Sequence, residues 1–140
     1  MRILAVDLGL ARTGLAISDE SGFLASPVGT VAEKDLAVLC QKVADIAAGQ
    51  QAGEIVVGLP RNMDGSYGES ARRAQDFARA LEQAAGRPVH LWDERMTTQS
   101  AAGYLNQTNT RGKKRKAVID TVAATIILQS YLDSRGGQGG

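Results

Sequence analysis

The chain has 140 residues, of which 44% are hydrophobic and 22% are charged. A chain of this length can bury a core without disulfides or a structural metal, and its single cysteine excludes a disulfide scaffold and a multi-cysteine zinc site. Its apolar stretches are far shorter than the roughly 20 residues that a membrane span requires. Asp7 interrupts the amino end before any signal-peptide core. We therefore expect a cytoplasmic globular protein that does not contact membranes.

The net charge of +1 is unevenly distributed along the chain. Residues 1–60 carry 4 Lys or Arg and 7 Asp or Glu, whereas residues 61–140 carry 12 and 8. Much of the positive excess lies in the run Arg111-Gly112-Lys113-Lys114-Arg115-Lys116. This run indicates either a surface that faces a polyanion or an ordinary solvated loop. Because only 4% of the residues are aromatic, a nucleic-acid surface built on base stacking is disfavoured.

The first thirty residues predict three strands joined by glycine-bearing turns. These strands are expected at residues 3–8, 14–18 and 23–31. The turns between them are too short for a crossover helix, so the three strands should form an antiparallel meander.

The rest of the chain alternates helix and strand. Its apolar periodicity predicts a helix near 33–48, a strand at 54–59, a helix near 68–85, a strand at 88–93 and a final helix from about 116 to 132. Such alternation implies parallel strands. The expected fold is α/β, with a mixed five-stranded sheet and flanking helices in the order of a ribonuclease H-like fold. A Rossmann or flavodoxin-like sheet would need a helix after its first strand.

One domain is expected over residues 1–133, followed by a disordered tail at residues 134–140. Within this domain, acidic residues follow two of the predicted strands: Asp7 ends the first strand, and Asp93 and Glu94 end the fifth. If both strands run parallel on either side of the fourth, these acids meet at one edge of the sheet. Successive strand residues point to opposite faces, so only one of Asp93 and Glu94 should face Asp7, and we favour Glu94. The alternatives are a turn-forming Asp7 and a helix-capping Asp93.

Asp120 lies near the start of the predicted final helix, which is apolar on nearly all its faces and must be substantially buried. A carboxylate beside such a surface needs a partner or a metal ion, unless it only benefits from the helix dipole in the first turn. Three acids at one edge would repel one another unless a cation binds them. His90 and Cys40 are the only residues of their types, so ligation by oxygen alone favours Mg²⁺ or Mn²⁺ at Asp7, Glu94 and Asp120.

Four separated segments of the chain resemble the YqgF (RuvX) family. They are Asp7-x-Gly9-x-x-Arg12-x-Gly14-x-Ala16, Val57-Gly58-Leu59-Pro60-x-Asn62-x-Asp64-Gly65, Asp93-Glu94-Arg95-x-Thr97-Thr98, and Lys113-Lys114 followed by Asp120-x-x-Ala123-Ala124 through Leu132. Each motif is short, but together they occur in the family's order and span residues 1–132.

This resemblance implies a ribonuclease H-like fold, a bacterial cytoplasmic location and a nuclease that uses Asp7, the Asp93-Glu94 pair and Asp120 in catalysis. The family is described as Holliday junction resolvase-like or as processing the 5′ end of precursor 16S ribosomal RNA, and we favour the RNA. Related resolvases usually carry a second acid at the end of strand four, where this chain has Gly58-Leu59-Pro60. Their last helix often carries another Asp where Ala123 stands.

Basic and polar residues near the acidic motifs are candidates for substrate binding. For nucleic-acid binding these are Arg12, Arg95, Lys113, Lys114, Arg115 and Lys116, and for a loop on the active edge they are Asn62 and Asp64. The expected partner is structured RNA or branched DNA, bound by a monomer or weak homodimer. Two competing hypotheses are a non-catalytic nucleic-acid-binding assembly factor and an actin- or sugar-kinase-like ATPase. Such ATPases need two domains of this kind around the nucleotide.

Overall fold

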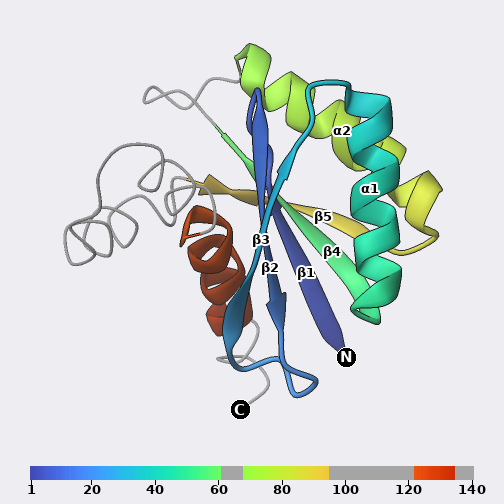
Figure 1. Ribbon diagram of the computed structural model, residues 1–140. Helices are drawn as coiled ribbons and strands as arrows, with labels where there is room; N and C mark the ends of the chain where they lie inside the picture. The colour runs from blue at the N-terminus through green and yellow to red at the C-terminus, as the bar shows by residue number, and fades with distance from the viewer. Residues whose placement is uncertain (61–67, 95–121, 135–140) are drawn as a thin grey trace.

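A single mixed sheet organises the computed structural model, which describes residues 1–60, 68–94 and 122–134. Its strands lie in the order β3-β2-β1-β4-β5 (Figure 1). Their bounds are Arg2–Asp7 for β1, Arg12–Ser18 for β2, Ala25–Ala32 for β3, Ala52–Leu59 for β4 and Val89–Asp93 for β5. The strands β1, β2 and β3 pair antiparallel, whereas β4 runs parallel to β1 and β5 parallel to β4. The predicted meander followed by two parallel strands is confirmed.

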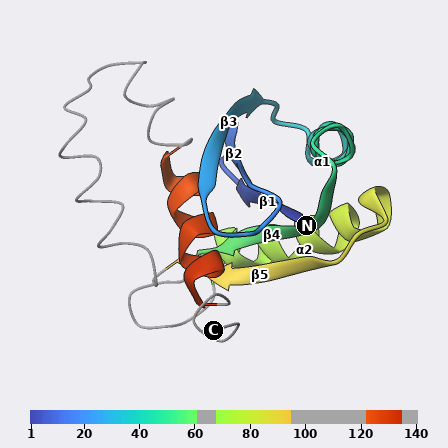
Figure 2. The same ribbon diagram turned by 90° about the horizontal axis from the view of Figure 1, so that it is seen from below.

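Helices cover both faces of this sheet. The helices α1 (Leu36–Gly49) and α2 (Glu69–Ala85) pack on one face, and a helix at residues 122–134 packs on the other (Figure 2). The two central strands β1 and β4 are therefore buried on both faces, which explains their continuous apolar sequences. No helix among the described residues is long and apolar enough to cross a membrane.

Alternate residues of the central strands contribute to two separate cores. Under α1 and α2 lies a cluster that includes Leu4 and Val6 of β1 together with Val57 and Leu59 of β4. Under the helix at 122–134 lies a second cluster, made of Ile3, Ala5, Ala16, Val56, Ala124, Ile127, Leu128 and Leu132. Each residue of a strand can thus be assigned to one face by its position in the alternation.

Among the element boundaries that differ from the predicted ones, two are set by side chains that cap the neighbouring backbone. The Asp35 carboxylate accepts hydrogen bonds from the backbone N–H of Ala37 at 2.9 Å and of Val38 at 3.3 Å, so α1 begins at Leu36 rather than near residue 33. Asp19 similarly binds the backbone N–H groups of residues 23 and 24, so β3 begins only at residue 25. The predicted start of the final helix near residue 116 lies outside the described residues.

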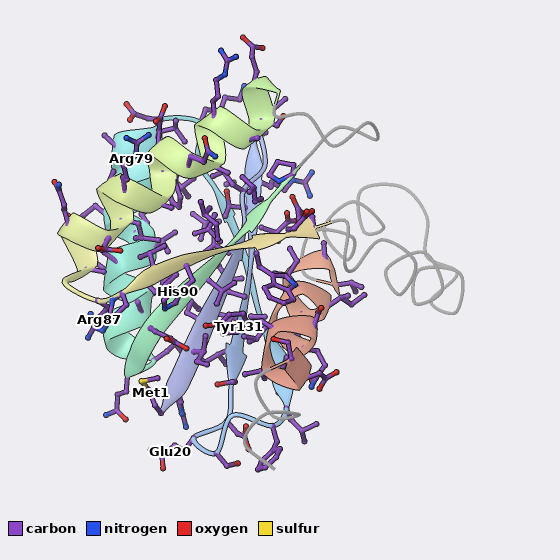
Figure 3. The ribbon with its side chains drawn as sticks, turned by 180° about the vertical axis from the view of Figure 1, so that it is seen from behind. Met1, Glu20, Arg79, Arg87, His90 and Tyr131 are labelled. Atoms are coloured by element: carbon purple, nitrogen blue, oxygen red, sulfur yellow. The ribbon has the colours of Figure 1, made fainter. Side chains whose placement is uncertain are left out.

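The helix at 122–134 is fixed to the sheet by polar contacts with β4 and β5. The buried carboxylate of Glu54 on β4 contacts His90 Nε2 at 3.2 Å and accepts from the Tyr131 hydroxyl at 3.4 Å. The rings of His90 and Tyr131 stack with their centroids 6.3 Å apart (Figure 3). Trp92 of β5 adds a bond from its indole N–H to the Ser130 hydroxyl at 3.2 Å. These contacts hold the helix over β4 and β5.

Candidate active site

Asp7 is the last residue of β1 and lies on the sheet face covered by the helix at 122–134. It follows the alternation of Ile3 and Ala5, which both belong to the core under that helix. Its partner on β2 is Gly14. On the β4 side, Val6 pairs with Val57, so the residue level with Asp7 is Gly58. Both strand neighbours of Asp7 are therefore glycines, and no neighbouring strand side chain shields its carboxylate.

Of the two acids at the end of β5, the structure brings Glu94 to Asp7. The side chains of His90 and Trp92 lie under the helix at 122–134, and Glu94 continues the same alternation. Asp93 instead pairs with Leu59, which belongs to the core under α1 and α2, so the alternation directs Asp93 to the opposite face.

Gly58 provides the space through which Glu94 reaches Asp7. A Cβ atom placed at position 58 would lie 3.1 Å from both Cγ and Cδ of Glu94 and 2.8 Å from Cδ1 of Ile127. The Glu94 carboxyl therefore lies directly over the backbone of the strand that separates β1 from β5. Strand β4 carries no acid at this place, since Gly58, Leu59 and Pro60 stand there, and the carboxyl reaches the edge from the end of β5.

Asp7 perturbs the titration of the Glu94 carboxyl. Burial, followed by the negative charge of Asp7, a hydrogen bond to Asp7 and the charge of Asp93, raises the pKa of Glu94 from 4.5 to about 8. At neutral pH and without a cation, Glu94 consequently keeps a proton, which it donates to Asp7. Two carboxyl groups that are this close indicate a site for a positively charged partner.

The turn that follows Asp7 is held by the neighbouring helix α2. The Arg73 guanidinium donates a hydrogen bond to the Gly9 carbonyl at 2.8 Å. A Cβ atom at position 9 would collide with the carbonyl oxygen of Arg12, so only glycine fits this turn. Arg12 begins β2 on the same face as Asp7, because it lies two residues before Gly14, the partner of Asp7.

Several predicted site residues lie outside the described residues. These are Asp120, Arg95, the basic residues Lys113, Lys114, Arg115 and Lys116, and the loop residues Asn62 and Asp64. Within the described ranges, no group of three or more His, Cys, Asp or Glu residues is arranged to hold a metal ion. The described part of the candidate site is thus the pair Asp7 and Glu94.

Two features of the site were not predicted: the space over Gly58 and the contact of Arg73 with the turn after Asp7. An isolated glycine inside an apolar strand is a known signal for the close approach of another group, so Gly58 could have been found from the sequence. Arg73 carries no such signal, because nothing in its amphipathic helix distinguishes it from the adjacent Arg72.

Comparison with known proteins identifies close relatives over the whole chain. A family model described as "RuvX: Holliday junction resolvase" matches residues 1–134. A protein of Pelotomaculum thermopropionicum named "Putative pre-16S rRNA nuclease" is 44% identical, and the match covers 97% of this chain and 89% of that protein. Proteins of the same name from Moorella thermoacetica and Bacillus subtilis are 42% and 41% identical, and the matches cover 99% of each. They cover 99% and 96% of this chain, respectively.

Solved structures share the fold at low sequence identity. Thermus thermophilus RuvC in complex with a Holliday junction substrate matches with a TM-score of 0.64 at 15% identity, over 98% of this chain and 96% of that chain. The Fowlpox virus resolvase in complex with Holliday junction DNA matches with a TM-score of 0.60 at 12% identity, over 96% and 99%. The predicted ribonuclease H-like fold is confirmed.

Proposed function

The chain belongs to the RuvX family, and on this premise we propose that it is a metal-dependent nuclease that processes the 5′ end of precursor 16S ribosomal RNA. The observation that carries the proposal is the contact between Asp7 and Glu94 on one face and one edge of a ribonuclease H-like sheet. The curated relatives named as pre-16S rRNA nucleases support RNA as the substrate. Such a role would place the protein in the bacterial cytoplasm.

The donor set fits a hard divalent cation. Asp7 and Glu94 offer only carboxylate oxygens, and Mg²⁺ is commonly held by one or two carboxylates together with water and substrate phosphate. Asp7, Glu94 and, from outside the described residues, Asp120 would hold Mg²⁺ or Mn²⁺. When bound, such an ion lowers the pKa of an attacking water and stabilises charge on the phosphoryl and leaving oxygens.

The chain's own residues orient and shield this site. Gly58 leaves room for Glu94 to reach Asp7, and Gly14 places no side chain beside the Asp7 carboxylate. Ile127 packs beside Glu94 and keeps water from its buried side, and this desolvation strengthens the electrostatic interaction of both carboxylates with a cation. The Arg73 contact holds the turn after Asp7 and so fixes the loop that borders the site.

The proposal is tested by incubating purified protein with a 5′ precursor 16S rRNA fragment and, separately, with a four-way DNA junction. We expect metal-dependent cleavage of the RNA that is abolished by chelator and falls by orders of magnitude in Asp7→Asn. Asp45→Asn makes the same change at an exposed position on α1 and should cleave normally.

Three outcomes would contradict parts of this proposal. Equal product from wild type and Asp7→Asn would identify a contaminating nuclease and leave a binding factor as the better description. Faster cleavage of the DNA junction than of the RNA would replace the RNA by branched DNA as the substrate. Full activity in chelator would exclude the metal.

A further inference from the structure

An open cavity of about 400 Å³ lies close to the candidate active site on the β2 and β3 side. It is lined by Ala11, Arg12, Ala32, Glu33 and Lys34. Ala11 lies in the turn between β1 and β2, Arg12 begins β2, Ala32 ends β3, and Glu33 and Lys34 lie in the segment that joins β3 to α1. Figure 1 shows both segments at the upper end of the sheet, where β1 ends. The cavity therefore opens at the same edge as Asp7.

The strand register places part of the cavity lining, Arg12 and Ala32, on the catalytic face as well. Gly14 is the partner of Asp7, and Arg12 lies two residues further along β2, so its side chain shares the face of Asp7. Ala32 is the partner of Arg12 on β3. Lys34 follows Ala32 by two residues and completes the lining. A strand that lies over Asp7 and continues toward β3 would thus pass over this cavity.

The cavity has a net positive charge, and its two cationic side chains are available to bind an anion. Within the described ranges, neither the Arg12 nor the Lys34 side chain forms a hydrogen bond or an ion pair. The acid between them is already engaged, because Glu33 binds Lys42 Nζ at 2.9 Å and accepts from the Asp35 backbone N–H at 3.2 Å. The Asp35 carboxylate is used to cap α1. Two cations that have no partner among the described residues therefore face an open space, and the nearby acids Glu33 and Asp35 are engaged elsewhere.

The position of these cations is held by the fold. The bond from Arg73 to the Gly9 carbonyl ties the β1–β2 turn to α2, and the β2–β3 pairing fixes Arg12 opposite Ala32. The capped start of α1 fixes the chain just after Lys34. The backbone at both residues is therefore already in place when an anion binds, so that only the two side chains have to be ordered.

We propose that Arg12 and Lys34 form a binding site for backbone phosphate of the nucleic-acid substrate, on the β3 side of the catalytic pair. This inference rests on the proposed nuclease function and extends it by giving the substrate strand a direction across the protein. Arginine binds phosphate through its planar guanidinium and lysine through a compact positive charge. Contacts of this kind position the strand without reading its sequence.

The experiment measures binding of a fluorescein-labelled 5′ precursor 16S rRNA fragment by fluorescence anisotropy, in chelator, over a series of salt concentrations. The Arg12→Gln/Lys34→Gln double variant should weaken binding several-fold. It should also lower the slope of log affinity against log salt by roughly 0.7 to 1.8, which corresponds to one or two phosphate contacts. The matched control is Arg79→Gln, which removes an exposed cation paired with Asp76 on α2 (Figure 3) and should leave the slope unchanged.

A second variant distinguishes a lost phosphate contact from misfolding, because it should bind RNA more tightly rather than more weakly. Glu33→Gln removes the acid from the cavity and should tighten RNA binding, an effect that an unfolded protein cannot produce. A double variant with the salt slope of Arg79→Gln, or a Glu33→Gln variant that binds no tighter than wild type, would overturn the phosphate site. Because affinity is measured without metal, a reduced slope in a protein that fails to cleave RNA would uphold the phosphate site and reject the nuclease function alone.

Discussion

Replacing Gly58 by alanine is expected to reduce metal-dependent cleavage severalfold, although it removes no chemical group from the candidate site. A methyl group at this position would lie 3.1 Å from Cγ and Cδ of Glu94 and 2.8 Å from Cδ1 of Ile127. The end of the Ile127 side chain can move aside, but the Glu94 side chain must also shift by a few tenths of an ångström. Because a misplacement of about 1 Å in a catalytic constellation can cost about two orders of magnitude in rate, this smaller shift should cause a severalfold loss. The measurement is single-turnover cleavage of the precursor RNA fragment.

Two further variants separate displacement of Glu94 from general damage to the fold. Gly49→Ala adds the same methyl group at the end of α1, where nothing lies within 4 Å, and should leave cleavage unchanged. Ile127→Val removes the Cδ1 atom that the new methyl group would meet. The clash with Ile127 should also lower the melting temperature of Gly58→Ala. The double variant Gly58→Ala/Ile127→Val should recover much of that melting temperature but little of the cleavage activity. Full activity in Gly58→Ala alone would show that the position of Glu94 over Gly58 is irrelevant to the reaction.

Replacing Glu94 by glutamine is expected to stabilise the metal-free protein at alkaline pH. The pKa of Glu94 is about 8 in the folded protein against 4.5 for an unperturbed glutamate. Below about pH 4.5 the group is protonated in both states and affects stability little. As the pH rises from 4.5 to 8, the unfolded state loses the proton while the folded state retains it, so wild type loses stability progressively. Above pH 8 the full loss, on the order of a few kcal/mol, is present.

Glutamine removes this loss and can still donate a hydrogen bond to Asp7. In chelator, the melting temperature of Glu94→Gln should therefore exceed that of wild type by several degrees at pH 9 and differ little at pH 4.5. Glu20→Gln makes the same change at an exposed turn and should show no such gain. Adding Mn²⁺ should raise the melting temperature of wild type more than that of Glu94→Gln. If the difference in melting temperature between Glu94→Gln and wild type stayed the same from pH 4.5 to pH 9, Glu94 would not share a site with Asp7.

The amino-acid sequence by itself determined the sheet and the edge at which the acids lie. The segments between the first three strands are too short for a helix, which forces antiparallel pairing, and the later alternation of helix and strand forces parallel pairing. From these local constraints alone, Asp7 and the Asp93-Glu94 pair were expected at the same edge. The pairings of β1 with β4 and of β4 with β5 confirm that arrangement. Local patterns suffice here because chain length and apolar periodicity restrict the topology.

Only the tertiary structure decided which acid meets Asp7 and what surrounds the pair. The choice between Asp93 and Glu94 depends on the register of β5, because a slip by one residue would exchange the two faces. The space over Gly58 is bounded by Ile127, from a helix about seventy residues later in the chain. The cavity at Arg12 and Lys34 likewise exists only because β2 pairs with β3. Such contacts join residues distant in sequence, and no local pattern encodes the distance between them.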